Sequence, residues 1–173
     1  HITSTARVVD AWHNTMWDSV LYYVVSSDHV NEQINVNKVS VCHNDTTTFY
    51  STVGSSSDGT ATPVFSTDMS NSMVRLKATA TGATGRLSYF KIGLGDNSSA
   101  ATAGNTEIVI NADVDSAAEA LDTFAHASYR GAKYYISVNN NTKTEVGNIE
   151  AIVVHDGTTA YISSYGELET GNN

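Results

Sequence analysis

Apolar and polar residues alternate along short stretches of this chain, and that spacing predicts β-strands rather than helices. In Met73–Ala80 the two kinds of residue fall on opposite sides of an extended chain. We therefore predict a half-buried strand with a basic, solvated face. Val64–Asp68 precedes it across a turn at 70–72, so the two strands are predicted to form a hairpin. The apolar side of the second strand consists of Val74, Leu76, Ala78 and Ala80.

A second group of predicted strands surrounds two tight turns. Val20–Ser26 is apolar at its centre without alternation, which is typical of a strand buried on both faces. Asn44-Asp45 and Asp156-Gly157 each separate two β-rich runs, and Asp-Gly is a strong hairpin signal because both residues tolerate positive φ. The other predicted strands are Val39–His43, Thr46–Ser51, Leu87–Leu94, Glu107–Asn111, Tyr134–Val138, Ile149–His155 and Thr158–Ser163.

The chain carries one strand-rich segment twice. Val9–Ser56 aligns with Leu121–Leu168 without gaps, and nine of the 48 positions are identical. Large aromatic residues recur at the same offsets, as expected where each copy buries the same anchors. We therefore predict a repeated unit whose second copy lacks counterparts of Val64–Leu94. The structural repeat positions are the pairs Tyr22 and Tyr134, Tyr23 and Tyr135, and His43 and His155.

These patterns predict an all-β fold, an antiparallel β-sandwich of jelly-roll-like character with a second, partial copy of the same unit. We expect residues 1–97 to form the first unit, 98–113 a linker with a short strand, and 114–173 the truncated second unit. Leu121–Tyr129 is expected to be a strand because it aligns with Val9–Trp17. The helical spacing of Ser116–Thr123 leaves a helix open as the alternative.

The charge of the chain bears on its partners. The formal net charge is −9 with only nine Lys and Arg, a surface that disfavours nucleic acid and anionic membranes. No apolar run approaches the roughly 20 residues of a membrane span, so no membrane insertion is expected. The start of the sequence lacks a signal peptide and an initiator Met, so we expect a processed product, an excised domain or part of a longer protein. Cys42 is the single cysteine, which excludes an internal disulfide and favours synthesis in a reducing cytoplasm.

Several segments of the chain resemble a known family. The runs Leu121–Phe124, Tyr129–Val138 and Val154–Tyr161 resemble a tandem repeat of virion structural proteins of marine cyanophages, and Val74–Thr79 resembles the later hairpin of that unit. The first copy departs from the repeat, with Asp18–Leu21 in place of Arg-Gly-Ala-Lys. The resemblance implies a tail-fibre-like or decorating protein of the virion surface or tail, made in the host cytoplasm. It supplies no catalytic residues.

The candidate chemical groups are few. His43 and His155 each end a strand before a hairpin turn, and a catalytic site seldom occurs twice at equivalent positions. We interpret both as structural hydrogen-bonding groups, with metal binding and catalysis as the alternatives. Asp10 and Asp122 are interpreted as turn or cap residues. We expect no cofactor, although calcium is an alternative reading of the oxygen-rich Asn111–Asp115, with Asp113 and Asp115 as its candidate ligands.

The aromatic residues have two interpretations. Retention in both copies favours core anchors, since ligand contacts need not recur in every unit. Exposed rings would instead suit sugar stacking, and Trp17 and Tyr129 are the best candidates for such a ligand-binding surface. The set consists of Trp12, Trp17, Tyr22, Tyr23, Tyr129, Tyr134 and Tyr135.

A half sandwich leaves an apolar face and open edges that need covering, which predicts assembly with other chains. We expect a homotrimer or a strand-exchanging polymer, in contact with other virion proteins. The leading prediction is a non-enzymatic structural component of a phage, a tail fibre or particle-surface protein. The alternatives are a host-glycan-binding module of a viral adhesion protein and a polysaccharide hydrolase. The sequence contains no Gly-x-Ser-x-Gly, phosphate-loop or HExxH motif to support an enzyme.

Overall fold

The structure is a computed structural model that describes residues 2–28, 32–58, 63–81, 85–94, 120–139 and 144–170. Every regular element within these ranges is a β-strand, and all paired strands are antiparallel, so the predicted all-β antiparallel fold is confirmed. The described residues include no helix long and apolar enough to cross a membrane. The strands are β1 (Arg7–His13), β2 (Ser19–Asp28), β3 (Gln33–His43), β4 (Thr48–Ser57), β5 (Val64–Ser70), β6 (Met73–Thr79), β7 (Gly85–Leu94), β8 (Gly131–Asn139), β9 (Val146–His155) and β10 (Ala160–Glu169).

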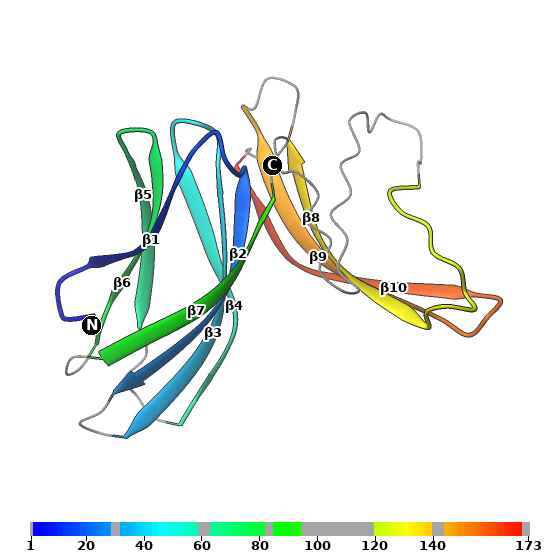
Figure 1. Cartoon of the computed structure of the whole chain (residues 1–173), viewed down its shortest axis with the longest axis horizontal. Coiled ribbons are helices and arrows are strands. Elements are labelled where there is room, and N and C mark those ends of the chain that lie inside the picture. Colours follow the sequence, from blue (N-terminus) through cyan, green and yellow to red (C-terminus); the bar gives the residue numbers. More distant parts are fainter. Residues whose placement is uncertain are drawn as a thin grey trace.

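Seven of these strands form two sheets that face each other in a β-sandwich-like arrangement (Figure 1). One sheet has the order β4-β3-β2-β7, and the other has the order β1-β6-β5. The central strand β2 pairs with β3 along one edge and with β7 along the other, so it has no free edge. Its side chains alternate in burial: Val20, Tyr22 and Val24 are fully buried in the core, whereas Tyr23 and Val25 on the other face are 36% and 42% exposed. The prediction of burial on both faces was therefore wrong at Tyr23 and Val25.

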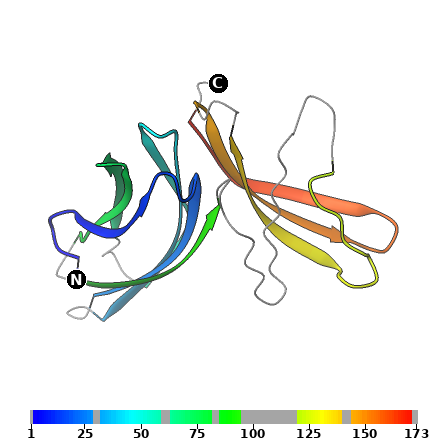
Figure 2. The same cartoon turned by 45° about the horizontal axis from the view of Figure 1, so that its top comes forward.

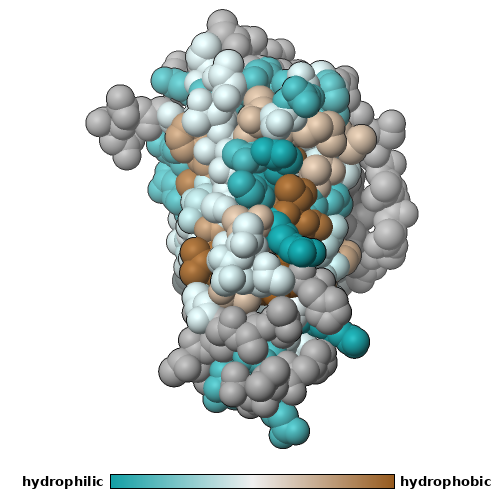
Figure 3. All heavy atoms as spheres, turned by 90° about the vertical axis from the view of Figure 1, so that its left-hand side faces the viewer, coloured by the Kyte–Doolittle hydropathy of each residue, from teal (hydrophilic) through white to brown (hydrophobic). Residues whose placement is uncertain are grey.

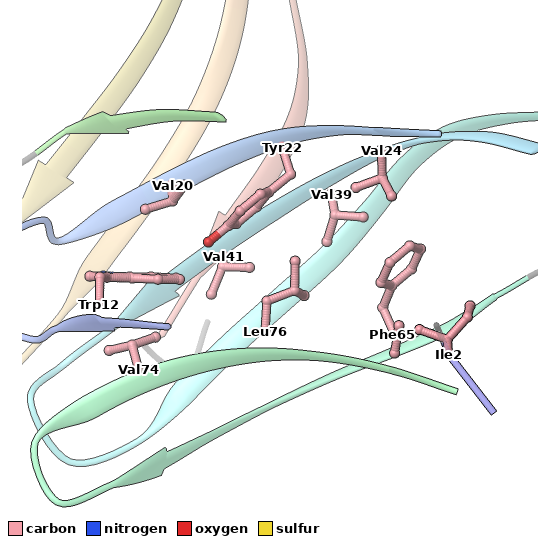
Figure 4. Close-up of a cluster of buried hydrophobic side chains, with 11 residues drawn as sticks. Ile2, Trp12, Val20, Tyr22, Val24, Val39, Val41, Phe65, Val74 and Leu76 are labelled. Carbon is pink, nitrogen blue, oxygen red and sulfur yellow. The ribbon is translucent and has the colours of Figure 1, made fainter. Parts of the chain in front are cut away.

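The hydrophobic core lies between these two sheets (Figure 4). Side chains of β2 and β3 point toward those of β6, with Trp12 of β1 closing one end and Phe65 of β5 near the other. Each fully buried side chain of this kind stabilises the fold by about 1.5–3 kcal/mol. The fully or nearly fully buried members are Ile2, Trp12, Val20, Tyr22, Val24, Val39, Val41, Phe65, Val74, Leu76 and Ala78.

The predicted hairpin of β5 and β6 is present, with Asn71 and Ser72 at positive φ in its turn. As predicted, β6 alternates, and its apolar residues Val74, Leu76 and Ala78 are buried. The outer face of the hairpin carries an ion network in which Arg75 and Lys77 both donate to Asp68. Figure 3 shows this side of the molecule, where hydrophilic side chains lie beside a few hydrophobic ones.

The remaining three strands form a separate sheet with the order β10-β9-β8 (Figures 1 and 2). One face of this third sheet packs against the outer face of the four-stranded sheet, mainly against β3 and β4. The contacts are polar: Ser40 Oγ donates to Asn148 Oδ1 at 2.8 Å, and Asn139 Nδ2 donates to Asp18 Oδ2 at 2.7 Å. We call this contact the joint.

One expected strand is absent. Residues 120–130 form turns and irregular structure, so the expectation of a strand over Leu121–Tyr129 was wrong. A strand requires a partner, and β1 has one in β6, whereas residues 120–130 pair with no described strand. The described part of Ser116–Thr123 is not helical either.

Two further expectations are not decided. The linker at 98–113 and its strand Glu107–Asn111 lie outside the described residues. The jelly-roll character and the division into two units stay predictions.

Candidate functional site

Two tyrosine–aspartate hydrogen bonds occur 112 positions apart. Tyr22 Oη donates to Asp10 Oδ2 at 2.8 Å, and Tyr134 Oη donates to Asp122 Oδ2 at 2.9 Å. Asp10 also accepts from Lys91 Nζ at 2.6 Å. The turn or cap interpretation was wrong for Asp10, which lies inside β1 and anchors the phenol of Tyr22. Asp122 lies in the irregular segment, and there the interpretation stays a prediction. Burial first, and then the aspartate, raise the pKa of both phenols, that of Tyr134 to about 12, so both hydroxyls stay protonated donors at neutral pH.

The two histidines also make equivalent contacts. His43 Nε2 donates to the Trp17 carbonyl at 2.8 Å, and His155 Nε2 donates to the Tyr129 carbonyl at 2.6 Å. In the first case Nδ1 accepts from the Asp45 amide at 3.1 Å, which places the ring hydrogen on Nε2. These contacts agree with a structural role that ties the segment before a strand to the hairpin that follows.

The hairpin turns after these histidines share their chemistry as well. Asn44 Oδ1 accepts from the Thr47 amide at 2.9 Å, and Asp156 Oδ1 accepts from the Thr159 amide at 2.9 Å. The hydrogen bonds from the threonine amides and hydroxyl hold the pKa of Asp156 below its ordinary value. Both hairpins contain a bulge with glycine at positive φ, Gly54 in β4 and Gly166 in β10.

Burial distinguishes the two sheets. Trp12, Tyr22 and Val41 are at most 2% exposed, whereas their counterparts Phe124, Tyr134 and Val153 are only half-buried. In the sandwich this face is covered by β5 and β6. In the third sheet no described strand covers it.

We call this uncovered surface of the third sheet the open face. It forms an open cavity of about 440 Å³. Its lining is mostly apolar, with one carboxylate and two imidazoles at the end nearest the irregular segment. It is lined by Leu121, Asp122, Thr123, Phe124, His126, Tyr134, Ile136, Ala151, Val153, His155, Gly157, Thr158, Thr159, Ala160 and Ile162.

The chemistry of the open face suits apolar contact. Ile162 is 72% exposed, the highest value among the large hydrophobic residues that the structure describes. His126 and His155 lie edge to face with ring centroids 6.1 Å apart. Phe124 lies edge to face with Tyr129 at 6.2 Å and tilted relative to His155 at 6.1 Å. No cluster of three or more His, Cys, Asp or Glu capable of holding a metal occurs among the residues that the structure describes. The calcium candidates Asp113 and Asp115 lie outside those residues.

The two candidate sugar-stacking residues differ in their surroundings. The Trp17 ring is partly buried against the core, and Lys91 Nζ lies 4.9 Å from its centroid. Tyr129 is 47% exposed beside Phe124. A sugar would have to displace Lys91 from the Trp17 ring, so of the two only Tyr129 presents an unobstructed surface.

Trp17 packs against Gly93 of β7, and this contact leads to a testable prediction. A Cβ at Gly93 would fall inside the van der Waals distance of the Trp17 ring, so Gly93→Ala must displace the indole. We expect a loss of about 1–3 kcal/mol in the free energy of unfolding and a shift in tryptophan fluorescence. Urea denaturation measures the first. Gly147→Ala is the control, because its Cβ would meet only ordinary contacts at 3.4 Å or more.

Tyr23 and Tyr135 lie at the joint rather than in the core. Tyr135 Oη lies 3.3 Å from Ser40 Oγ, and burial raises the pKa of this phenol to about 12. Tyr23 is 36% exposed and packs near Phe90, with ring centroids 6.4 Å apart. The repeat positions thus divide between two sheet faces, one directed at the core or the open face and the other at the joint.

The charged centre of the joint is Glu150, which the sequence analysis missed. This residue is only 2% exposed and pairs with both Lys38 and Lys133, the latter at 3.1 Å. Burial by itself raises the pKa of Glu150, but hydrogen bonds and charges from the two lysines outweigh it and hold the pKa below its ordinary value. Lys38 and Glu150 are 112 positions apart, so the alignment contained the signal: one repeat position with opposite charges.

Comparison with known proteins identifies no family. The sequence matches no protein-family model and no curated protein. The interpretation of the open face therefore depends on its own geometry and on the covered face of the same molecule.

Proposed function

We propose that this chain is a structural component of a phage virion, a tail-fibre or particle-surface protein that acts by assembly through the open face. The observation that carries the proposal is the contrast in burial. Trp12 and Val41 are buried in the sandwich, whereas the residues at the equivalent positions of the third sheet, Phe124 and Val153, are only half-buried. An apolar sheet face of this kind is characteristic of protein contact sites. The resemblance to cyanophage repeats supports the virion as its location.

Assembly is tested by the mass of the purified chain. We expect native mass spectrometry and light scattering to show a mass that rises with concentration, because apolar open faces associate in water. Ile162→Glu should restore the monomer, since it places a carboxylate on the open face. Val64→Glu is the matched control, because Val64 is 53% exposed on the outer side of β5.

Two results would contradict the proposal. One is a monomer at every concentration, and the other is equal loss of association in both variants. The location on the virion is tested separately with an antibody raised against the chain. Immunogold label is expected on particles of a phage that encodes the chain, and unlabelled particles would refute a virion role.

A further inference from the structure

We propose that the occupant of the open face is an amphipathic β-hairpin with the residue pattern of β5 and β6. This inference rests on the proposed function, because it names the partner through which the chain assembles. The partner is defined by chemistry: two short strands joined by a tight turn, with alternate apolar residues on one side and polar residues on the other.

The sandwich supplies the template for this docking. There, Phe65, Val74 and Leu76 of the hairpin cover the inner face of the four-stranded sheet and are at most 4% exposed. The covered side chains of that sheet are Val20, Tyr22, Val24, Val39 and Val41. Their counterparts on the open face are Ala132, Tyr134, Ile136, Ala151 and Val153, all apolar or aromatic and in the same order. Four of these are half-buried, and Ala151 is already buried at 3% exposed.

The backbone register of the two sheets also matches. Val39 pairs with Thr52 and Ala151 pairs with Ser164, in both sheets on the side of the bulge that lies toward the hairpin turn. Each residue of the second pair lies 112 positions after its counterpart in the first pair. The register of a sheet decides which side chains lie on the same face. Because the register is equal, the open face presents its side chains in the same arrangement as the sheet face that the hairpin covers in the sandwich.

The irregular segment at 120–125 is the second half of the docking site. In the sandwich β6 pairs with β1 from Arg7↔Ala78 to His13↔Met73. The matching residues 120–125 carry Phe124 at the place of Trp12 and are not in a strand. A docked hairpin would provide backbone hydrogen-bond partners for this segment, so docking should convert residues 120–125 into an edge strand.

The hairpin cannot be the β5 and β6 of another copy unless that copy exposes its own core. The described part of each chain has two faces of this type and one such hairpin, and that hairpin is already buried in its own core. Exchange between copies would uncover one face for each face that it covers. The number of open faces would stay the same, so the expected strand-exchanging polymer gains no burial, and the occupant is a hairpin additional to residues 64–79.

The test uses the whole chain and a synthetic peptide of residues 64–79, closed into a ring because isolated hairpins are marginally stable. We expect saturable binding and at least tenfold slower amide exchange at residues 121–125. The peptide should also suppress the concentration-dependent association. A control peptide with Val74→Asp and Leu76→Asp should do neither. Val153→Asp in the chain should weaken binding by about tenfold or more, equivalent to about 1.4 kcal/mol, because its counterpart Val41 is fully buried under the hairpin.

A covalent form removes the dependence on peptide affinity. Residues 62–94 are joined after Asn173, which places a second copy of the hairpin 112 positions beyond the first. Slowed exchange at residues 121–125 in this fusion, absent when Val74→Asp and Leu76→Asp are made in the added copy, supports the proposal. Unchanged exchange with both peptide and fusion overturns it.

The outcomes separate the two proposals. If the chain associates, Ile162→Glu abolishes that association, and neither hairpin docks, then assembly stands and the hairpin partner is wrong. A discrete dimer that protects residues 121–125 and resists the hairpin would identify a second copy as the occupant and would also overturn the inference. If the chain neither associates nor binds a hairpin, both proposals fail.

Discussion

Replacing Trp12 with alanine is expected to lower the free energy of unfolding by about 3–5 kcal/mol, the range for a large aromatic residue in a packed core. Trp12 is 2% exposed, its Nε1 donates to the Trp17 carbonyl at 3.2 Å, and its ring packs at 6.1 Å from that of Tyr22. Phe124→Ala, at the equivalent position on the open face, should cost only about 1 kcal/mol. The difference arises because water already reaches the Phe124 ring.

Urea denaturation followed by circular dichroism measures both variants. Val8→Ala is the control, since Val8 lies in β1 but is 49% exposed and should change stability by no more than about 0.5 kcal/mol. Equal losses for Trp12→Ala and Phe124→Ala would mean that the open face is covered in solution. Addition of the cyclic hairpin should increase the cost of Phe124→Ala, because docking buries that ring.

The strands were predictable where the sequence contains the information locally. Alternation in Met73–Ala80 and the turn residues at Asn44-Asp45 and Asp156-Gly157 depend only on neighbours in sequence, and the structure has strands and turns at these places. The strand at Leu121–Tyr129 was predicted from its alignment with β1. That inference failed because β1 owes its strand geometry to β6, some sixty residues away, and the described part of the third sheet has no equivalent.

In the candidate site, too, some features were predictable from the sequence and others depend on contacts between distant segments. The roles of Tyr22 and His43 in packing and hydrogen bonding followed from their recurrence as Tyr134 and His155. The partner of each aspartate did not follow, because the Tyr22–Asp10 contact joins strands of different sheets and depends on how those sheets are stacked. The open face itself follows from the missing counterparts of Val64–Leu94, whereas the joint at Glu150 requires the docking of two sheets, which no local pattern encodes.

Removing the carboxylate of Glu150 is the second large expected effect. Glu150→Leu should weaken the attachment of the third sheet by about 3 kcal/mol, because it leaves Lys38 and Lys133 facing each other without a counter-ion. Lys38 is the more affected of the two, since its side chain is 14% exposed against 46% for Lys133. Lys133 can turn to solvent.

Cys42 provides the measurement. This thiol is fully buried in β3, on the strand face that also carries Lys38 and Ser40 toward the third sheet, and burial raises its pKa to about 12. It is the only cysteine, so the rate of thiol labelling reports detachment of the third sheet. A loss of 3 kcal/mol should accelerate labelling by roughly a hundredfold. Labelling as slow as in the unmodified chain would show that Glu150 does not hold the sheets together.

A double variant separates the ion pair from simple packing. Lys38→Met with Glu150→Leu replaces both partners by apolar side chains, which is often close to neutral in stability. We expect the double variant to be less destabilised than the sum of the two single variants, with an interaction energy of about 1–3 kcal/mol. Additive losses would mean that the lysine and the glutamate act independently.

The pH dependence of stability tests the same interaction between Glu150 and the two lysines. The folded pKa of Glu150 lies below its ordinary value of 4.5, so folding favours the ionised carboxylate. Its contribution is therefore complete above pH 4.5 and is lost as the pH falls through the lower, folded value. The unmodified chain should lose stability in urea over this acidic range, and Lys38→Met with Glu150→Leu should show a shallower loss. Because Asp68 and Asp156 also have lowered pKa values and remain in both proteins, the difference between the two curves isolates Glu150. An identical slope in both would contradict a carboxylate held ionised by the two lysines at the joint.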